Sequence, residues 1–480
     1  MRVYSSLTRK MEDFQPLVDG ELRMYACGIT PYDEIHIGHA RQAIVYDVLR
    51  AYFEFLGYKV IYVRNFTDVD DKIIKRANKE GRQSSEVSEQ YIEDNSRDLE
   101  LLKVRKATYE PKVTECIPDI IGYIQGLIDN GFAYVSNGEV LFDVGRFADY
   151  GKLSNRRKEE LVNSEESPNK RSSNDFVLWK PHKPGEPHWD SPWSKGRPGW
   201  HIECSAMAMK FLGEEIDIHG GGLDLIFPHH ENEIAQSEGY SGKRFARYWL
   251  HNGLVMVDGT KMSKSLGNFL TVKEALKSYF AEEIRYVVLT HNYSTNIDFS
   301  KSLFLNARKR LYYFYTTLSK INQILAGENA DISPERVPAI IAGLGDSFVQ
   351  FMDDNFNTPR VTSELADVFK ELNRVLVSGK YSLEEKKGIF AAFLKSFRKV
   401  TNVLGLFEED PDEYLSKLRA RVLTERGLSE DMIKAKVAER QSAKEAQDYA
   451  RADSIKEKLK AAGITVQDSR ESAGWEIIFQ

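Results

Sequence analysis

Apolar and polar positions near the start of the chain follow first the period of a strand and then that of a helix. Residues 22–26 form a short apolar run that ends in a polar loop, and residues 40–56 place Ile44 and Val48 on one helical face. A second apolar run covers residues 60–63. A strand, a helix and a strand in this order are typical of a doubly wound parallel sheet, which binds ligands at the carboxyl ends of its strands. We therefore predict an α/β, Rossmann-like domain with a nucleotide site beyond the first strand.

The pattern changes between about residues 110 and 195, where we predict an insertion into this domain. Residues 117–129 have a helical period, and residues 133–144 contain the pair Asn137-Gly138, which marks a β-hairpin. Strand-like segments resume after residue 215. The sheet domain is therefore expected to continue beyond the insertion.

The second half of the chain has mainly helical periods. Residues 301–406 favour a separate helical bundle. After an acidic stretch, residues 431–461 predict one long charged helix, and residues 464–479 predict a short β-like tail. The predicted organisation is an α/β domain over residues 1–300, a helical bundle over residues 301–406 and a small α+β module over residues 420–480.

The composition is that of a globular protein, with 42% hydrophobic and 29% charged residues among 480. No apolar run approaches the ~20 residues of a membrane span, and residues 1–10 lack the apolar core of a signal peptide, so we expect a cytoplasmic protein without membrane contact. The cysteines Cys27, Cys116 and Cys204 lie too far apart for a disulfide framework, which leaves packing, metal binding or catalysis. Because the net charge is -6, any nucleic-acid surface would have to be local.

Two short motifs have the residues that a triphosphate site needs. His36-Ile-Gly-His39 lies between the first predicted strand and helix, where backbone amides and the helix dipole favour phosphate. Lys261-Met-Ser-Lys-Ser265 lies about 220 residues later in a Gly-rich setting, where two lysines could hold a leaving pyrophosphate. Each motif alone is weak evidence for such a site, and a helix-capping histidine or a surface lysine pair is then the better explanation. Their occurrence together, in this order, favours a nucleotide-activating enzyme.

Four other residues have the chemistry of a metal site. His229 and Glu233 are four positions apart, so a helix that begins at Pro228 would place both on one face and His230 elsewhere. Cys27 and Cys204 could complete a tetrahedral site with two thiolates. Buried, packing cysteines beside a solvated helix start explain the same residues, and the pattern alone leaves both alternatives open.

A glycine run forms a third candidate element. His219 and Asp224 flank Gly220-Gly-Gly222, where bare backbone would let adenosine approach closely and the carboxylate could accept a hydrogen bond from a ribose hydroxyl.

The two motifs together resemble the HIGH and KMSKS signatures of class I aminoacyl-tRNA synthetases. Longer segments are similar to the cysteinyl-tRNA synthetase family, namely residues 24–30 (MYACGIT), 64–72 (RNFTDVDDK), 196–204 (GRPGWHIEC) and 217–233 (DIHGGGLDLIFPHHENE). The resemblance extends over nearly the whole chain. It implies that the protein activates L-cysteine with Mg-ATP and transfers the cysteinyl group to the 3' end of tRNA-Cys.

The resemblance also implies roles for individual residues. One Zn²⁺ ion per chain would be bound by Cys27, Cys204, His229 and Glu233. The residues expected to act in catalysis are His36, His39, Lys261 and Lys264. Those expected to bind ATP are Gly38, His219, Gly221, Asp224 and Lys264, and those expected to bind the amino acid are Gly28, Thr67 and Trp200. For Trp200, core packing is the alternative.

Zinc suits the discrimination that such an enzyme needs. Serine differs from cysteine by one atom, and an apolar pocket rejects near-isosteres by only about 100-fold. A thiol deprotonates and bonds to Zn²⁺ far more readily than a hydroxyl does. We therefore expect no editing domain.

The resemblance gives the remaining regions roles in tRNA binding. It implies a stem-contact region near residues 250–300, an anticodon-side bundle at 301–406 and an anticodon-recognition module at 420–480. In this module Trp475 is followed by Glu476-Ile-Ile-Phe, which departs from the basic residues common in the family. A monomer is expected.

Two alternative functions are compatible with parts of this pattern. The cysteine:amino-sugar ligase of mycothiol biosynthesis has a similar opening but lacks a full anticodon-binding extension, whereas this chain continues for about 180 residues after Ser300. A non-catalytic, RNA-binding paralogue would be indicated by a lost motif lysine or metal ligand, and all of these residues are present here.

Overall fold

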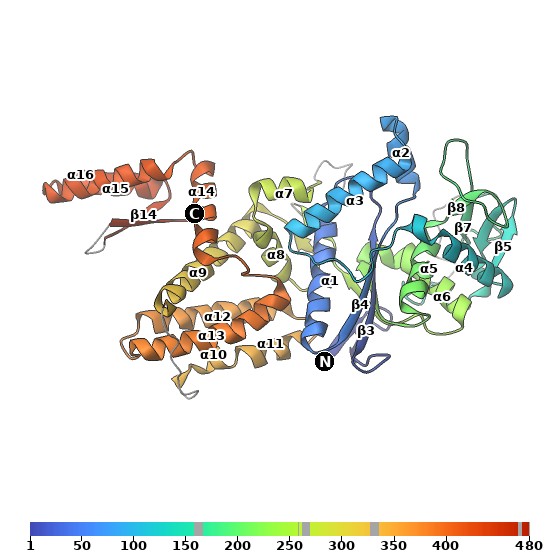
Figure 1. The fold of residues 1–480 in the computed structure, drawn as a ribbon, viewed down its shortest axis with the longest axis horizontal. Coiled ribbons are helices and arrows are strands. Elements are labelled where there is room, and N and C mark those ends of the chain that lie inside the picture. The colour runs from blue at the N-terminus through green and yellow to red at the C-terminus, as the bar shows by residue number, and fades with distance from the viewer. Residues whose placement is uncertain (158–166, 258, 262–268, 327–335, 469–472, 480) are drawn as a thin grey trace. The chain divides into compact units, whose positions relative to one another are not determined.

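The computed structural model describes residues 1–157, 167–257, 259–261, 269–326, 336–468 and 473–479 (Figure 1). They form two compact units. Unit 1 comprises residues 1–300, 343–366 and 396–406, and unit 2 comprises residues 301–342, 367–395 and 407–480. The division into three domains stays a prediction.

A parallel four-stranded sheet is the centre of unit 1. Its strand order is β10 (Ala246–Asn252), β9 (Ile216–Gly222), β3 (Glu21–Ile29) and β4 (Lys59–Phe66), and every neighbouring pair is parallel. The helix α1 (Ile37–Phe55) connects β3 to β4 and covers one face, while α5 (Trp200–Leu212) and α6 (Glu231–Ser241) lie on the other (Figure 1). The predicted Rossmann-like α/β fold is confirmed.

The apolar pattern of the strands explains why the sheet is buried on both faces. Central residues of β3, from Met24 to Cys27, are all buried, and β9 is buried along its whole length. Continuous burial of this kind is expected for parallel strands that helices cover on both sides. Because β3, β9 and β10 are parallel, their carboxyl ends lie together at one edge of the sheet.

Between β4 and β9 the chain adds helices and a second sheet. The helices are α2 (Asp71–Glu80), α3 (Ser84–Leu101) and α4 (Ile117–Asp129). The sheet has the order β5 (Ala133–Ser136), β6 (Glu139–Phe142), β7 (Phe176–Pro181) and β8 (Gly196–Pro198), and it is antiparallel. Asn137 and Gly138 both have positive φ, 51° and 79°, and Ser136 pairs with Glu139, so the predicted hairpin is confirmed.

The rest of unit 1 surrounds the central sheet. One small sheet pairs β1 (Arg2–Ser5) with β2 (Lys10–Asp13). Another has the order β12 (Thr260–Lys261), β11 (Val255–Val257) and β13 (Ile297–Asp298). Unit 1 also contains the helices α7 (Val272–Ser278), α8 (Ala281–Leu289) and α11 (Leu344–Met352). Two helices, α12 (Thr358–Val377) and α13 (Leu383–Leu404), have residues in both units.

Unit 2 is mainly helical. Its elements include α9 (Lys301–Leu325), α10 (Ala339–Ala342), α14 (Pro411–Glu425), α15 (Glu430–Glu445) and α16 (Tyr449–Ala461), followed by the antiparallel pair β14 (Ile464–Asp468) and β15 (Ala473–Ile477). The predicted β-like tail is confirmed by this pair.

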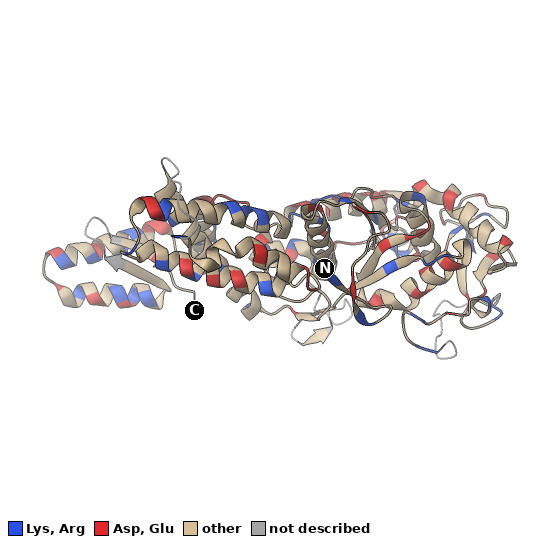
Figure 2. Ribbon diagram, turned by 90° about the horizontal axis from the view of Figure 1, so that it is seen from below, with Lys and Arg blue, Asp and Glu red and all other residues tan. Residues whose placement is uncertain are grey.

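The prediction of one long helix over residues 431–461 is wrong, because the chain breaks into α15 and α16. Gln447 has φ of 59°, which a helix interior does not allow, and the Asp448 side chain accepts a hydrogen bond from the backbone N–H of Arg451. Asp448 thus caps a new helix. Acidic and basic residues alternate along both helices (Figure 2), and Arg451 of α16 forms an ion pair with Glu439 of α15 at 3.0 Å.

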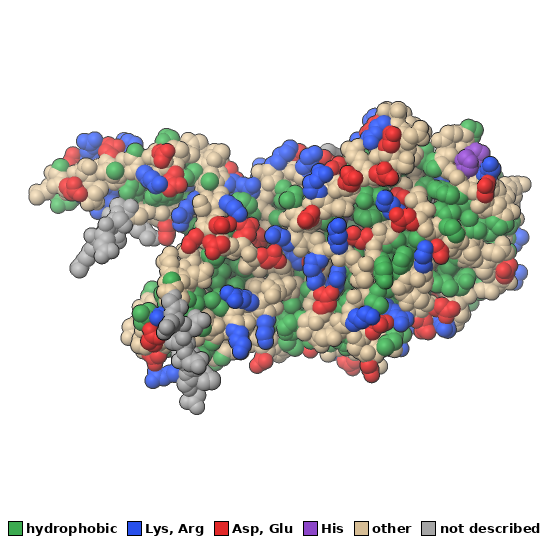
Figure 3. Space-filling view, viewed as in Figure 1, with side chains coloured by type: hydrophobic (Ala, Val, Ile, Leu, Met, Phe, Trp, Pro, Cys, Tyr) green, Lys and Arg blue, Asp and Glu red, His purple; other side chains and the backbone are tan. Residues whose placement is uncertain are grey.

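The surface carries charges of both signs. Acidic and basic side chains are interspersed over the face drawn in Figure 3. Among the helices of the described ranges, none combines the length and apolarity that crossing a membrane requires.

Candidate active site

A cleft of about 580 Å³ lies at the carboxyl ends of the parallel strands of unit 1. It is bordered by the end of β3, the start of α1 and the loops that follow β9 and β10. Of the residues predicted to act in catalysis or substrate binding, those lining it are Gly28, His36, Gly38, His39, Trp200 and Asp224. The edge of the sheet at which it lies is where doubly wound folds bind ligands.

The two histidines of the first motif are held at the start of α1. His36 is the N-cap residue, and its Nδ1 accepts a hydrogen bond from Gly38 N at 3.0 Å. The His36 and His39 rings stack with centroids 3.7 Å apart. A helix N-terminus carries partial positive charge and free N–H groups, so this end of the cleft favours phosphate.

The segment after the second motif pairs with the first motif. Ile37 N donates to Leu270 O at 3.0 Å, Val272 N donates to Ile35 O at 2.9 Å, and His36 and Thr271 form an antiparallel bridge. We call this pairing of residues 35–37 with residues 270–272 the motif joint. It brings together two segments that are more than 200 residues apart in sequence.

The second motif itself is described only at its first residue. The backbone of Lys261 pairs with Met256 of β11 at the end of β12. Residues 262–268, which include Lys264, lie outside the described residues. The catalytic roles of both lysines therefore stay predictions.

The four predicted metal ligands form one cluster in the floor of the site. Their ligand atoms all lie within 4.8 Å of one another. Cys27 Sγ is 3.7 Å from Cys204 Sγ and 3.2 Å from Glu233 Oε1, and His229 Nε2 is 3.0 Å from that same carboxylate oxygen. All four side chains are buried, with at most 3% of any residue exposed.

Local structure explains how distant residues reach this position. Cys27 lies near the end of β3, where the pairing with β4 shifts register, and Cys204 lies on α5. Phe227 is extended, with φ of -136° and ψ of 133°, so the helical backbone begins at Pro228, as predicted, and continues into α6. Because the chain stays helical across the junction at His230, His229 and Glu233 still point to the same side.

The cluster holds buried negative charge. The hydrogen bond between Cys204 and Cys27 lowers the pKa of Cys204 to about 6, although burial of Cys204 opposes this shift. Burial raises the pKa of Cys27. Burial also opposes ionisation of Glu233, but His219 and His229 hold its pKa well below the usual range. Against burial, Glu233 and Cys204 raise the pKa of His229 to about 10. A thiolate and a carboxylate beside one imidazole are a donor set that a divalent cation fits.

A second layer of histidines surrounds the cluster. His201 Nδ1 lies 3.0 Å from His229 Nδ1, and His219 Nε2 lies 2.8 Å from Glu233 Oε2. His230 contacts His251 at 2.8 Å and is also 3.9 Å from Glu233. The expectation that His230 points elsewhere is thus wrong, because this helical turn directs both neighbouring imidazoles into the core.

The residues predicted from the sequence do not include His201 and His251, which contact His229 and His230. His201 precedes Cys204 by three residues on α5, and this i, i+3 spacing was an available signal. His251 lies on β10 and gave no comparable local signal.

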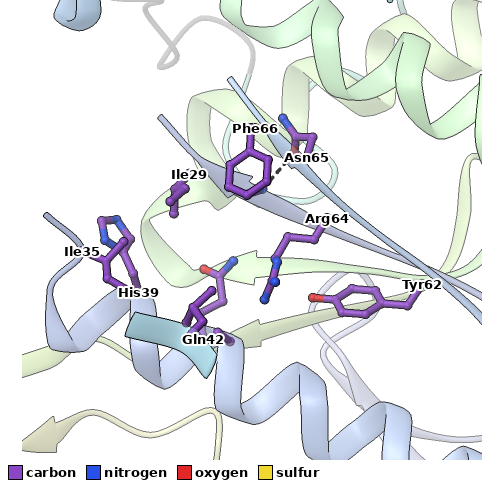
Figure 4. Close-up of a pocket in the computed structure, with 11 residues that line it drawn as sticks. Ile29, Ile35, His39, Gln42, Tyr62, Arg64, Asn65 and Phe66 are labelled. Atoms are coloured by element: carbon purple, nitrogen blue, oxygen red, sulfur yellow. Dashed lines mark hydrogen bonds between the residues drawn. The ribbon is translucent and has the colours of Figure 1, made fainter. Parts of the chain in front are cut away.

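The predicted amino-acid-binding residues differ in exposure to the cleft. Gly28 and Trp200 line it, and the Trp200 ring stacks on His229 with centroids 4.4 Å apart. Thr67 is buried beside β4, where its hydroxyl donates to Glu203 at 3.1 Å. A small pocket of about 40 Å³ continues behind Gly28, and Asn65, whose Oδ1 accepts from Gly28 N, lies at its wall (Figure 4).

Of the predicted ATP-binding residues, some line the cleft and others lie in the core. Gly38 and Asp224 line the cleft, whereas His219 contacts Glu233 in the core. Gly221 is buried on β9, where a Cβ would lie 2.8 Å from the Leu225 side chain.

Comparison with known proteins gives matches along the whole chain. Residues 13–309 match the tRNA synthetases class I (C) catalytic domain, and residues 347–408 match the DALR domain. The cysteine–tRNA ligase of Geobacter sulfurreducens is 46% identical over 99% of both chains. That of Thermococcus onnurineus is 44% identical over 100% of this chain and 99% of the relative. Mycobacterium tuberculosis methionyl-tRNA synthetase in complex with methionyl-adenylate has a similar fold, with a TM-score of 0.63 over 86% of this chain and 94% of that chain, at 12% identity.

Proposed function

The chain belongs to the cysteine–tRNA ligases, which are class I aminoacyl-tRNA synthetases, and we propose that a zinc ion in the four-residue cluster selects its amino acid. Family membership makes cysteine, ATP and tRNA its substrates, and cysteinyl-tRNA, AMP and diphosphate its products. Relatives matched over their full length do not favour the amino-sugar ligase or the silent paralogue. The observation that carries the zinc proposal is the convergence of four buried donors beside the cleft.

The donor set fits zinc better than it fits a harder cation. Two cysteines, one histidine and one glutamate match the ligand types and the coordination number that zinc takes in proteins. When bound, the ion supplies a soft Lewis acid that prefers the sulfur of cysteine to the oxygen of serine. All four donors are buried, and burial of thiolates and a carboxylate is favourable only when a cation balances their charge at close range.

The chain's own residues position the substrates around this cluster. Trp200 covers His229 and forms one wall of the cleft, and Gly28 brings bare backbone to the end of β3. His36, His39 and the N-terminus of α1 stabilise charge that develops on the phosphates of Mg-ATP. Lys261 and Lys264 are proposed to hold the leaving pyrophosphate.

The first experiment measures charging of a tRNA-Cys transcript by the purified protein with cysteine or serine, before and after zinc removal. We expect charging with cysteine that depends on the metal. Cys204→Ser should lose both bound zinc and activity, whereas Cys116→Ser, at a buried cysteine that is not part of the cluster, should retain both. Full cysteine-specific charging by metal-free protein would contradict the zinc proposal without contradicting the ligase activity.

The tRNA contacts rest on the family. We propose that residues 301–406 and 420–480 bind the anticodon side of tRNA-Cys and that the protein acts as a monomer. Several cations of the C-terminal module already form ion pairs, such as Lys434 with Glu430 and Lys436 with Glu439. Phosphate contacts by these lysines would compete with those pairs. Truncation before residue 420 removes the proposed anticodon-recognition module, and it should therefore weaken tRNA binding more than cysteine activation.

A further inference from the structure

Asn252, a residue that lines the cleft, has a buried hydrogen-bond acceptor to which no described residue donates. It is the last residue of β10, lines the cleft and is only 4% exposed. Its Nδ2 donates to Gly253 O at 3.2 Å, and among the described residues none donates to its Oδ1. A buried acceptor without a donor is costly, so such an atom calls for a partner.

The contact with Gly253 determines which way the amide faces. If the amide turned over, Oδ1 would meet the carbonyl oxygen of Gly253, and two acceptors would oppose each other. Nδ2 therefore faces Gly253 and Oδ1 remains available as an acceptor.

The loop behind Asn252 is held firmly. The buried guanidinium of Arg41 donates to Leu254 O at 3.0 Å and to Tyr293 O at 2.9 Å, and Leu254 N donates to Asn296 Oδ1 at 2.9 Å. At Gly253 a Cβ would lie 2.1 Å from Thr295 O, so the backbone packs closely there. Asn252 is thus presented by a supported loop, as a recognition residue should be.

The position of Asn252 indicates which part of ATP it meets. It pairs in register with Gly222, and Asp224, the proposed partner of the ribose, follows two residues later. His36 and His39 are at the start of α1, at the phosphate end. With Asp224 as the proposed partner of the ribose, we place the nucleoside on the β9–β10 side of the cleft.

We propose that Asn252 Oδ1 accepts a hydrogen bond from the nucleoside of ATP, and so acts as a specificity-determining residue for the nucleotide. The hydrogen-bond donors of adenosine are its 6-amino group and its 2'- and 3'-hydroxyls, so the partner is one of these. This inference rests on the proposed position of ATP in the cleft.

The test combines one variant with three ATP analogues. Cysteine-dependent ATP–pyrophosphate exchange is measured for wild type and Asn252→Ala with ATP, purine riboside triphosphate, 2'-deoxy-ATP and 3'-deoxy-ATP. We expect kcat/KM with ATP to fall about tenfold in the variant, mostly through KM. With the analogue that lacks the bonded donor, wild type should fall by a similar factor and the variant should lose nothing further.

Asn296→Ala is the matched control, because Asn296 supports the same loop but does not line the cleft. Its loss should be equal with all four nucleotides. An equal loss in Asn252→Ala with all four would overturn the inference and leave Asn252 a structural residue. If Asn252→Ala does not fold, Asn252→Ser replaces it as the test variant in the same comparison.

Wild type alone also decides the question. If it uses all three analogues as well as ATP, Oδ1 meets no donor of the nucleoside and the inference fails. The proposed function fails separately, if wild type gives no cysteine-dependent exchange with ATP.

Discussion

Replacing Gly28 with alanine tests whether close packing of β3 on β4 sets the position of the neighbouring ligand Cys27. A Cβ at Gly28 would lie 1.6 Å from Asn65 O and 2.7 Å from Asn65 C, both of which are backbone atoms of β4. Backbone cannot rotate away as a side chain can. The two strands would have to separate by about 1.4 Å or more to restore an ordinary contact.

The expected effect on activity follows from this displacement. Cys27 is bonded to Gly28 and would move with it, away from Cys204 and Glu233. A misplacement of about 1 Å at a reacting centre costs on the order of 100-fold in rate. We therefore expect kcat/KM for cysteine in ATP–pyrophosphate exchange to fall about 100-fold and the zinc content per chain to fall with it.

Gly122→Ala is the control for this substitution. Gly122 lies on α4 with nothing within 4 Å of its added Cβ, so alanine there should leave exchange and zinc content unchanged. Thermal unfolding of both variants separates loss of the site from loss of the fold. Wild-type exchange and zinc content in Gly28→Ala would refute the reasoning, because they would show that the ligand set does not depend on this contact.

Three further substitutions have defined outcomes. Arg285→Met should lower the free energy of unfolding by about 3–5 kcal/mol in urea titrations, because the buried Arg285 guanidinium is 2.6 Å from Asp47 Oδ2; an unchanged midpoint would contradict this. Burial and then Glu34 raise the pKa of Asp98 to about 6, so folding favours its protonated form. Wild type should therefore lose stability relative to Asp98→Asn as pH rises through 6, by about 1 kcal/mol after solvent screening, and match it below pH 4; parallel stability curves would exclude the shift. Cys116→Ala should cost about 1 kcal/mol of stability yet retain zinc and cysteine activation, and loss of the metal would show that Cys116 is more than a packing residue.

The parts of the fold that could be predicted from sequence are those with local signals. The hairpin at Asn137-Gly138 requires positive φ at two neighbouring residues, and the pair Asn-Gly predicts such a turn because both residues adopt positive φ readily. The break between α15 and α16 has a weaker signal, because its flanks are strong helix formers and only Gln447-Asp448 mark the turn.

The site shows the same division. His229 and Glu233 could be paired from their spacing, but their meeting with Cys27 and Cys204 depends on how β3, α5 and α6 pack. The available Oδ1 of Asn252 could not be predicted at all, because it depends on the orientation of one amide against Gly253.

The motif joint has a consequence for how this chain can change in length. Since residues 35–37 bond directly to residues 270–272, the distance between the two signature segments does not depend on the chain that connects them. The second sheet and its helices can therefore grow, shrink or be exchanged without moving residues 35–37 and residues 270–272 apart. Such a joint makes the second sheet and its helices a replaceable module within the chain.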